Sequence, residues 1–203
     1  MEQTNTQESL KLEFLNLINR ISGYFKYQKT LGVNYLDISP QSINKIKKLI
    51  IHIDDCSLIE QGLYNAKLFI IKDHLLSPNE IINTPYDGYA GKIIVKILQA
   101  MNLTKNDVYI LSIDSTCKNI NSCINYIKEQ INLVKPKIIL LFGDFITKIF
   151  LETNKPLYNL RGRFHNYKDI KVMATFHPDS FIKEPLKKRD VWTDIKIIIR
   201  ELT

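Results

Sequence analysis

The sequence lacks the features of a membrane-spanning or secreted protein. Its 203 residues contain no run of about 18 uncharged apolar residues, which excludes a membrane-spanning helix. The first residues, MEQTNTQESLKLEF, have neither the basic nor the apolar region of a signal peptide, so we expect a cytoplasmic protein. A chain of this length buries roughly 70% of its unfolded surface, so it needs no disulfide or metal merely to fold.

Alanine and arginine are also scarce. The chain has 4 Ala against 32 Ile and 5 Arg against 23 Lys, a bias that an AT-rich genome would produce. The net charge of +7 suits an anionic partner such as nucleic acid. Mutational drift toward lysine would give the same charge, and both explanations stay open.

The apolar pattern alternates between strands and helices. Short apolar runs predict strands at 68–71, 107–113, 137–143 and 171–176. Helical spacing predicts helices at 89–101, 120–134, 145–150 and 191–202. Strands that are apolar throughout are typical of a parallel sheet with helices on both faces. We therefore expect an α/β fold, a three-layer α/β/α sandwich around a central parallel four-stranded sheet.

The first part of the chain has a different pattern. Apolar residues at helical spacing predict helices at 8–28 and 42–51, and Gly32 and Pro40 interrupt the pattern between them. We expect an N-terminal helical extension over residues 1–50 and the α/β domain over residues 51–203.

Polar residues follow each predicted strand. They are Lys72, Asp73 and His74; Ser112 and Asp114; Gly143 and Asp144; and His177, Pro178 and Asp179. In open parallel sheets, ligands bind at the carboxyl ends of the strands. Pro178 restricts His177 to an extended backbone, which places the imidazole at the mouth of a crevice. The alternative is a strand-end histidine bonded to nearby backbone.

Three blocks of the sequence follow the pattern of a known family. Residues 157–196 carry LRGRFH, a strand, FHP, a basic stretch and a tryptophan before the last helix. TPYDGYAGKII covers 84–94, and VKPKIILLFGD covers 134–144. In this order they resemble family 4 of the uracil-DNA glycosylases, from about residue 54 onward. The resemblance implies a monomeric DNA repair enzyme that hydrolyses the N-glycosidic bond of uracil, or of a related deaminated base, in DNA.

The resemblance also implies roles for individual residues. His177 would donate a hydrogen bond to the uracil oxygen, where negative charge develops as the bond breaks. Asp73 would orient the attacking water, and Tyr86 would stack on the flipped base. The remaining substrate-binding positions would be Gly88, Ser112 and Gly143.

Two positions depart from the family pattern. The first motif falls on KDHLL at 72–76 and lacks both of the family's glycines. Ser112 stands near the family's asparagine, and a serine cannot make a two-point amide contact with the base edge. Either base discrimination is poorer here, or another residue supplies that contact, with His74 and Asp114 as the candidates.

Basic residues cluster in the segment that carries the resemblance. We expect Arg161, Arg163, Lys187 and Lys188 to contact DNA phosphates. The alternative is that this run of charge is a solvated face of the protein.

The family holds a 4Fe–4S cluster with four cysteines, and this chain has three. Cys56, Cys117 and Cys123 match the second, third and fourth ligands. Either His52 replaces the missing thiolate, or the cluster has been lost and the cysteines pack as small apolar residues. A disulfide is not expected in a cytoplasmic protein.

The altered first motif leaves alternatives to catalysis. The chain is either an active glycosylase or a catalytically inactive DNA-binding descendant of the same fold. A third hypothesis is a protein that now makes protein contacts alone.

Overall fold

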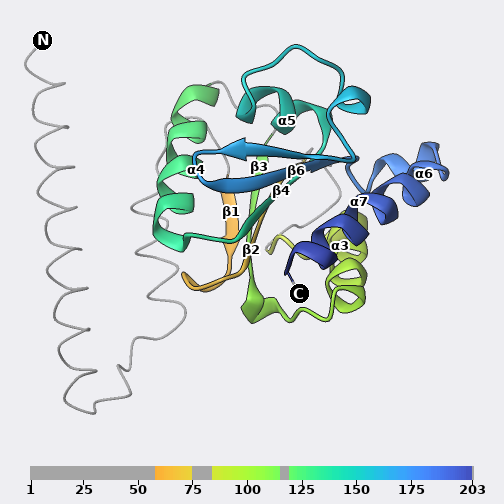
Figure 1. Cartoon of the computed structure of the whole chain (residues 1–203), viewed down its shortest axis with the longest axis horizontal. Helices are drawn as coiled ribbons and strands as arrows, with labels where there is room; N and C mark the ends of the chain where they lie inside the picture. Colours follow the sequence, from red (N-terminus) through yellow and green to blue (C-terminus); the bar gives the residue numbers. More distant parts are fainter. Residues whose placement is uncertain (1–57, 75–83, 115–118, 203) are drawn as a thin grey trace, which may run out of the picture. The chain divides into compact units, whose positions relative to one another are not determined.

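The computed structural model describes residues 58–74, 84–114 and 119–202, drawn in colour in Figure 1. All of them belong to one compact unit, Ile51–Thr203. The helices predicted at 8–28 and 42–51, and the extension over 1–50, lie outside the described residues. Within the described ranges, no helix combines the length and apolar character needed to cross a membrane.

A six-stranded mixed sheet forms the centre of this unit, in the order β1-β3-β2-β4-β6-β5. Its four middle strands are parallel: β2 (Leu68–His74), β3 (Val108–Asp114), β4 (Ile138–Phe142) and β6 (Ile170–Thr175). The edge strands β1 (Leu58–Gln61) and β5 (Phe164–Tyr167) run antiparallel to β3 and β6. The predicted parallel sheet is confirmed as the centre, but its count of four strands is wrong for the whole sheet. Each edge strand has only four residues and is partly exposed, so neither shows an apolar run in the sequence.

The helices occupy the predicted segments between the strands. They are α3 (Gly88–Ala100), α4 (Ile120–Val134), α5 (Asp144–Phe150), the short α6 (Ser180–Lys183) and α7 (Lys187–Leu202). The last helix begins four residues before its predicted start, because its first turn is polar and exposed and carries no apolar signal. The four-residue α6 was not predicted, since it is too short to show helical spacing.

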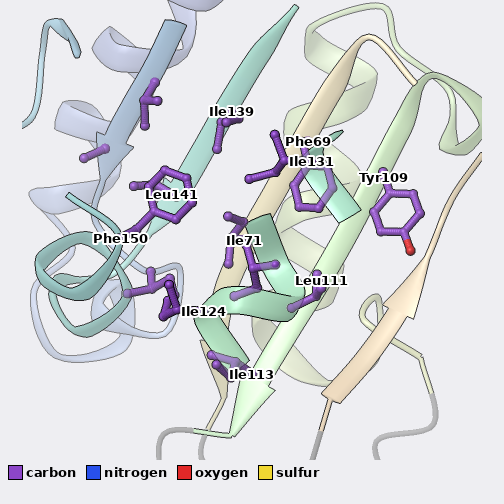
Figure 2. Packing of buried hydrophobic residues seen from close by; sticks show 14 of the residues in the cluster. Phe69, Ile71, Tyr109, Leu111, Ile113, Ile124, Ile131, Ile139, Leu141 and Phe150 are labelled. Carbon is purple, nitrogen blue, oxygen red and sulfur yellow. The ribbon is translucent and has the colours of Figure 1, made fainter. Parts of the chain in front are cut away.

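Side chains of the parallel strands alternate between two separate apolar clusters. Phe69 and Ile71 pack with α4 and α5, and this cluster is shown in Figure 2. Leu68 and Ile70 pack with α3 and α7 on the opposite face. Both faces of the sheet are therefore covered, which confirms the three-layer α/β/α sandwich.

The register of the parallel strands aligns their carboxyl ends. Lys72 on β2 lies between Ser112 on β3 and Phe142 on β4, and Phe142 lies beside Thr175 on β6. The backbone N–H of Gly143 then donates to the Thr175 carbonyl at 2.9 Å. The residues that follow these strands consequently emerge at one edge of the sheet.

Candidate active site

Asp73 and His177 meet at the glycine that follows β4. Gly143 has φ 110°, and a Cβ added to it would lie 2.6 Å from Asp73 Oδ1 and 3.6 Å from His177 Cβ. A position with this backbone and so little space admits only glycine. Gly143 therefore lets an acid from β2 and a histidine from beyond β6 share one edge of the sheet.

The Asp73 carboxylate is largely withdrawn from solvent. Burial raises its pKa, and the nearby His177 ring opposes that rise, as Lys72 does more weakly. Its Oδ1 is buried and accepts no hydrogen bond from the described residues. This buried oxygen is an acceptor that a bound water molecule could use as a hydrogen-bond partner.

Local backbone contacts orient His177. The backbone N–H and the hydroxyl of Ser180 both donate to the His177 carbonyl, at 3.0 and 2.7 Å, as the chain turns into α6. The backbone N–H of Asp179 donates to His177 Nδ1 at 3.3 Å, while Asp179 Oδ2 lies 3.4 Å from the same nitrogen. Asp179 therefore offers Nδ1 both a donor and an acceptor. When Nδ1 of the neutral ring accepts from the Asp179 N–H, the ring hydrogen is on Nε2, which can donate to a ligand.

The histidine's backbone contact was the alternative that the sequence left open. In the structure this contact to Nδ1 is present, and His177 also lies beside Asp73 at the carboxyl ends of the parallel strands.

Tyr86 lies just before the start of α3. It is buried, and Gly91 on the first turn of the helix leaves room for its backbone. The ammonium of Lys105 lies 4.5 Å from the centre of its ring. Burial raises the pKa of its hydroxyl to about 12, so the phenol stays protonated at neutral pH. Gly88, with φ 70°, directly follows the Asp87 N-cap of the helix.

A hollow of about 480 Å³ opens beside Tyr86. It is lined by Thr84, Tyr86, Asp87, Lys92, Val95, Lys96, Gln99 and Lys105. The backbone N–H of Thr84 donates to Asp87 Oδ2 at 2.7 Å, which closes the turn that precedes α3. An aromatic ring with lysines around it suits a planar, anionic ligand such as a nucleotide.

Two further polar residues lie at the same strand ends. Ser112 is fully buried, and its hydroxyl makes no hydrogen bond to the described residues. Lys72, to which the sequence assigned no role, is only 2% exposed. Its position beside Asp73 at the end of a predicted strand is the sequence feature that could have identified Lys72 as a site residue. The side chains of His74 and Asp114, the other candidates for reading a base, lie outside the described residues.

The four basic residues expected to bind DNA differ in their surroundings. Arg163 and Lys188 are exposed, while Lys187 lies 2.6 Å from Glu184 and over the Phe176 ring. Arg161 is turned inward and is only 14% exposed.

An internal ion pair accounts for the position of Arg161. Its Nε and Nη2 donate to the two carboxylate oxygens of Asp194, at 3.0 and 2.9 Å. Asp194 is fully buried and also accepts from Thr175 Oγ1 at 2.5 Å. Arg161 therefore joins the loop before β5 to α7, and its Nε and Nη2 are already bonded within the chain.

The cysteines do not fit a four-thiolate cluster. Cys123 is fully buried on α4 and is disulfide-bonded, so the expectation that the chain has no disulfide is wrong. Cys56 and Cys117 lie outside the described residues, as does His52. The chain has only three cysteines, and Cys123 is not a free thiolate, so the four thiolates that a 4Fe–4S cluster uses are not available. Among the described residues no group of His, Cys, Asp or Glu could hold a metal ion.

The chain is similar in sequence to known proteins over most of the described residues. The family model described as the uracil DNA glycosylase superfamily matches residues 66–196. A Type-4 uracil-DNA glycosylase of Archaeoglobus fulgidus is 25% identical over 154 residues, which cover 68% of this chain and 77% of that protein. Another, of Sulfurisphaera tokodaii, is 25% identical over 187 residues, which cover 79% of this chain and 84% of that protein. Since the family match covers more than half of the sequence and includes Asp73, Gly143 and His177, the chain belongs to the uracil DNA glycosylase superfamily.

Proposed function

We propose that this protein is a DNA repair glycosylase that hydrolyses the N-glycosidic bond of uracil, or of a related deaminated base, in DNA. The observation that carries the proposal is the meeting of Asp73 and His177 at Gly143, on the sheet edge where ligands bind in such folds. The names of its relatives support the same reaction and substrate.

The side chains can divide the reaction between them. A uracil flipped out of the DNA stacks on the ring of Tyr86, which lines the hollow beside α3. His177 donates its Nε2 hydrogen bond to a uracil oxygen as the bond from C1′ to the base nitrogen breaks. The departing base takes the bonding electrons as an anion, and this hydrogen bond stabilises the charge.

Asp73 acts on the attacking water, on the side of the sugar opposite to the departing base. Its carboxylate accepts a hydrogen bond from a water molecule and takes the proton as the water oxygen bonds to C1′. The products are an abasic site and free uracil, which regains a proton from solvent. The pKa of Asp73 is raised by burial, which makes the ionised carboxylate a better proton acceptor than an exposed one.

Exposed basic residues near α7 would hold the DNA backbone. We include Arg163, Lys187 and Lys188 as phosphate contacts and leave out Arg161. We further propose that the protein acts on DNA as a monomer in the cytoplasm. The inactive-descendant hypothesis is not favoured, because both proposed catalytic side chains are present and close together.

Release of uracil from oligonucleotides tests the proposal. The full chain is incubated with single- and double-stranded DNA containing one uracil, and with matched DNA containing cytosine or thymine. We expect uracil release, and a loss of about 10²- to 10³-fold in the His177→Ala variant, as when one donor to a developing oxyanion is removed.

A second histidine provides the matched control. His165 on β5 contacts the Leu160 carbonyl through Nε2 at 2.7 Å and belongs to no part of the proposed site. His165→Ala should retain base release in the folded fraction. Folded wild-type protein that releases no base from any of these substrates would overturn the proposed function.

A further inference from the structure

Lys72 and Ser112 form a buried polar pair at the carboxyl ends of two neighbouring strands. They are direct neighbours on the parallel strands β2 and β3. Side chains along a strand alternate between the two faces of the sheet. Lys72 and Ser112 therefore lie on the same face as Ile70 and Ile110, which is the face that α3 covers. Since Tyr86 belongs to the cluster on that same face, the pair lies on the side where the flipped base would stack.

Ser112 needs a partner that the described residues do not supply. Its side chain is 0% exposed, and its Oγ makes no hydrogen bond to them. A buried polar group without a hydrogen bond is costly, and such groups in folded proteins are usually satisfied by a ligand or by water. The hydroxyl is therefore a candidate ligand contact at the end of β3.

Three carboxylates act electrostatically on the ammonium group of Lys72. It interacts electrostatically with Asp73, Asp87 and Asp179, which oppose the lowering of its pKa by burial. These carboxylates come from the end of β2, the N-cap of α3 and the segment before α6. Lys72 is thus a buried cation at the end of β2 with carboxylates in its surroundings, and none of the ion pairs within 4.0 Å among the described residues involves it.

We propose that Lys72, with Ser112 beside it, reads the edge of the flipped base and selects a carbonyl where the undamaged base carries an amino group. An ammonium has three donors and no acceptor. It can therefore bond to uracil O4 but not to the amino group that cytosine carries at the same position. The inference rests on the proposed function and names the residue that sets the base specificity of that site.

The test combines one residue change with one substrate change. Uracil release is compared with release of pyrimidin-2-one, which is uracil without O4, from otherwise identical single-stranded oligonucleotides. We expect wild-type protein to favour uracil by a larger factor than Lys72→Met does, with the two factors differing by at least about tenfold. The intrinsic difference between the two leaving groups is the same for both enzymes and cancels in the comparison.

Other variants separate recognition from structure. Ser112→Ala should reduce the preference for O4 by a smaller factor than Lys72→Met, and Lys72→Arg should restore part of it. Thermal unfolding of each variant identifies any that fail to fold, and Lys72→Gln then provides a second uncharged replacement.

The outcomes distinguish this inference from the proposed function. Wild-type release of uracil with an unchanged preference in Lys72→Met would overturn the role of Lys72 alone. Faster uracil release by Lys72→Met would also overturn it, because the side chain would then be obstructing the pocket. Absence of base release by the wild type would overturn the proposed function instead.

Discussion

Replacing Gly143 with alanine should disable the site by displacing Asp73. The added Cβ would lie 2.6 Å from Asp73 Oδ1, about 0.8 Å inside the 3.4 Å at which ordinary contact begins. The contacted atom belongs to a short, buried side chain, so the carboxylate or the β4 end must move by a comparable distance. A misplacement of about 1 Å in a catalytic group costs on the order of 10²-fold in rate. Backbone strain at φ 110° adds about 1–3 kcal/mol of destabilisation.

Gly162 offers a matched control for this prediction. It also has a positive φ, of 77°, but its added Cβ would meet its nearest neighbour, Asp194 Oδ1, only at 3.6 Å. Both alanine variants should therefore lower the unfolding temperature, while Gly143→Ala alone should lose about 10²-fold in single-turnover uracil release. Equal activity of the two variants, each measured where it is folded, would refute the reasoning that Gly143 makes room for Asp73.

Two further predictions concern the ion pair and the acid. Arg161→Met should destabilise the protein by about 3–5 kcal/mol, because it leaves the buried Asp194 without its cation, whereas exposed Arg163→Met should stay within about 0.5 kcal/mol. Chemical denaturation measures both changes, and equal midpoints would contradict the inward role of Arg161. Base release should fall as the pH drops through a midpoint above the ordinary value for aspartate, because burial raises the pKa of Asp73 and catalysis needs its ionised form. The same raised pKa means that ionisation of Asp73 opposes folding. Asp73→Asn should therefore become more stable than the wild type as the pH rises through that midpoint, and it should show no such advantage well below it.

The strand-end residues could be predicted from the sequence because buried parallel strands leave a strong signal. The runs around Ile70 and Leu140 are apolar on both faces, and the residues that follow each run must emerge at one edge. That rule alone brings Asp73, Gly143 and His177 together. The edge strands β1 and β5 gave no such signal, since one side of each faces solvent and neither is longer than four residues.

The direction of a long polar side chain could not be predicted in the same way. Arg161 and Arg163 are two residues apart in one basic motif, yet one is buried against Asp194 and the other is exposed. No sequence pattern identifies Lys72 as buried, because it follows directly after the apolar residues of β2 and two further polar residues come after it. Such placements depend on partners from distant segments, here α7 for Arg161 and the α3 N-cap for Lys72.

The central claim is that Asp73 and His177 act on one bond from opposite sides of a shared site. Single-turnover uracil release by Asp73→Asn, His177→Ala and the double variant tests it most directly. The account predicts that each single variant loses about 10²-fold or more, and that the double variant loses much less than the product of the two, as for residues that act as a unit. Wild-type rates in either single variant would contradict it.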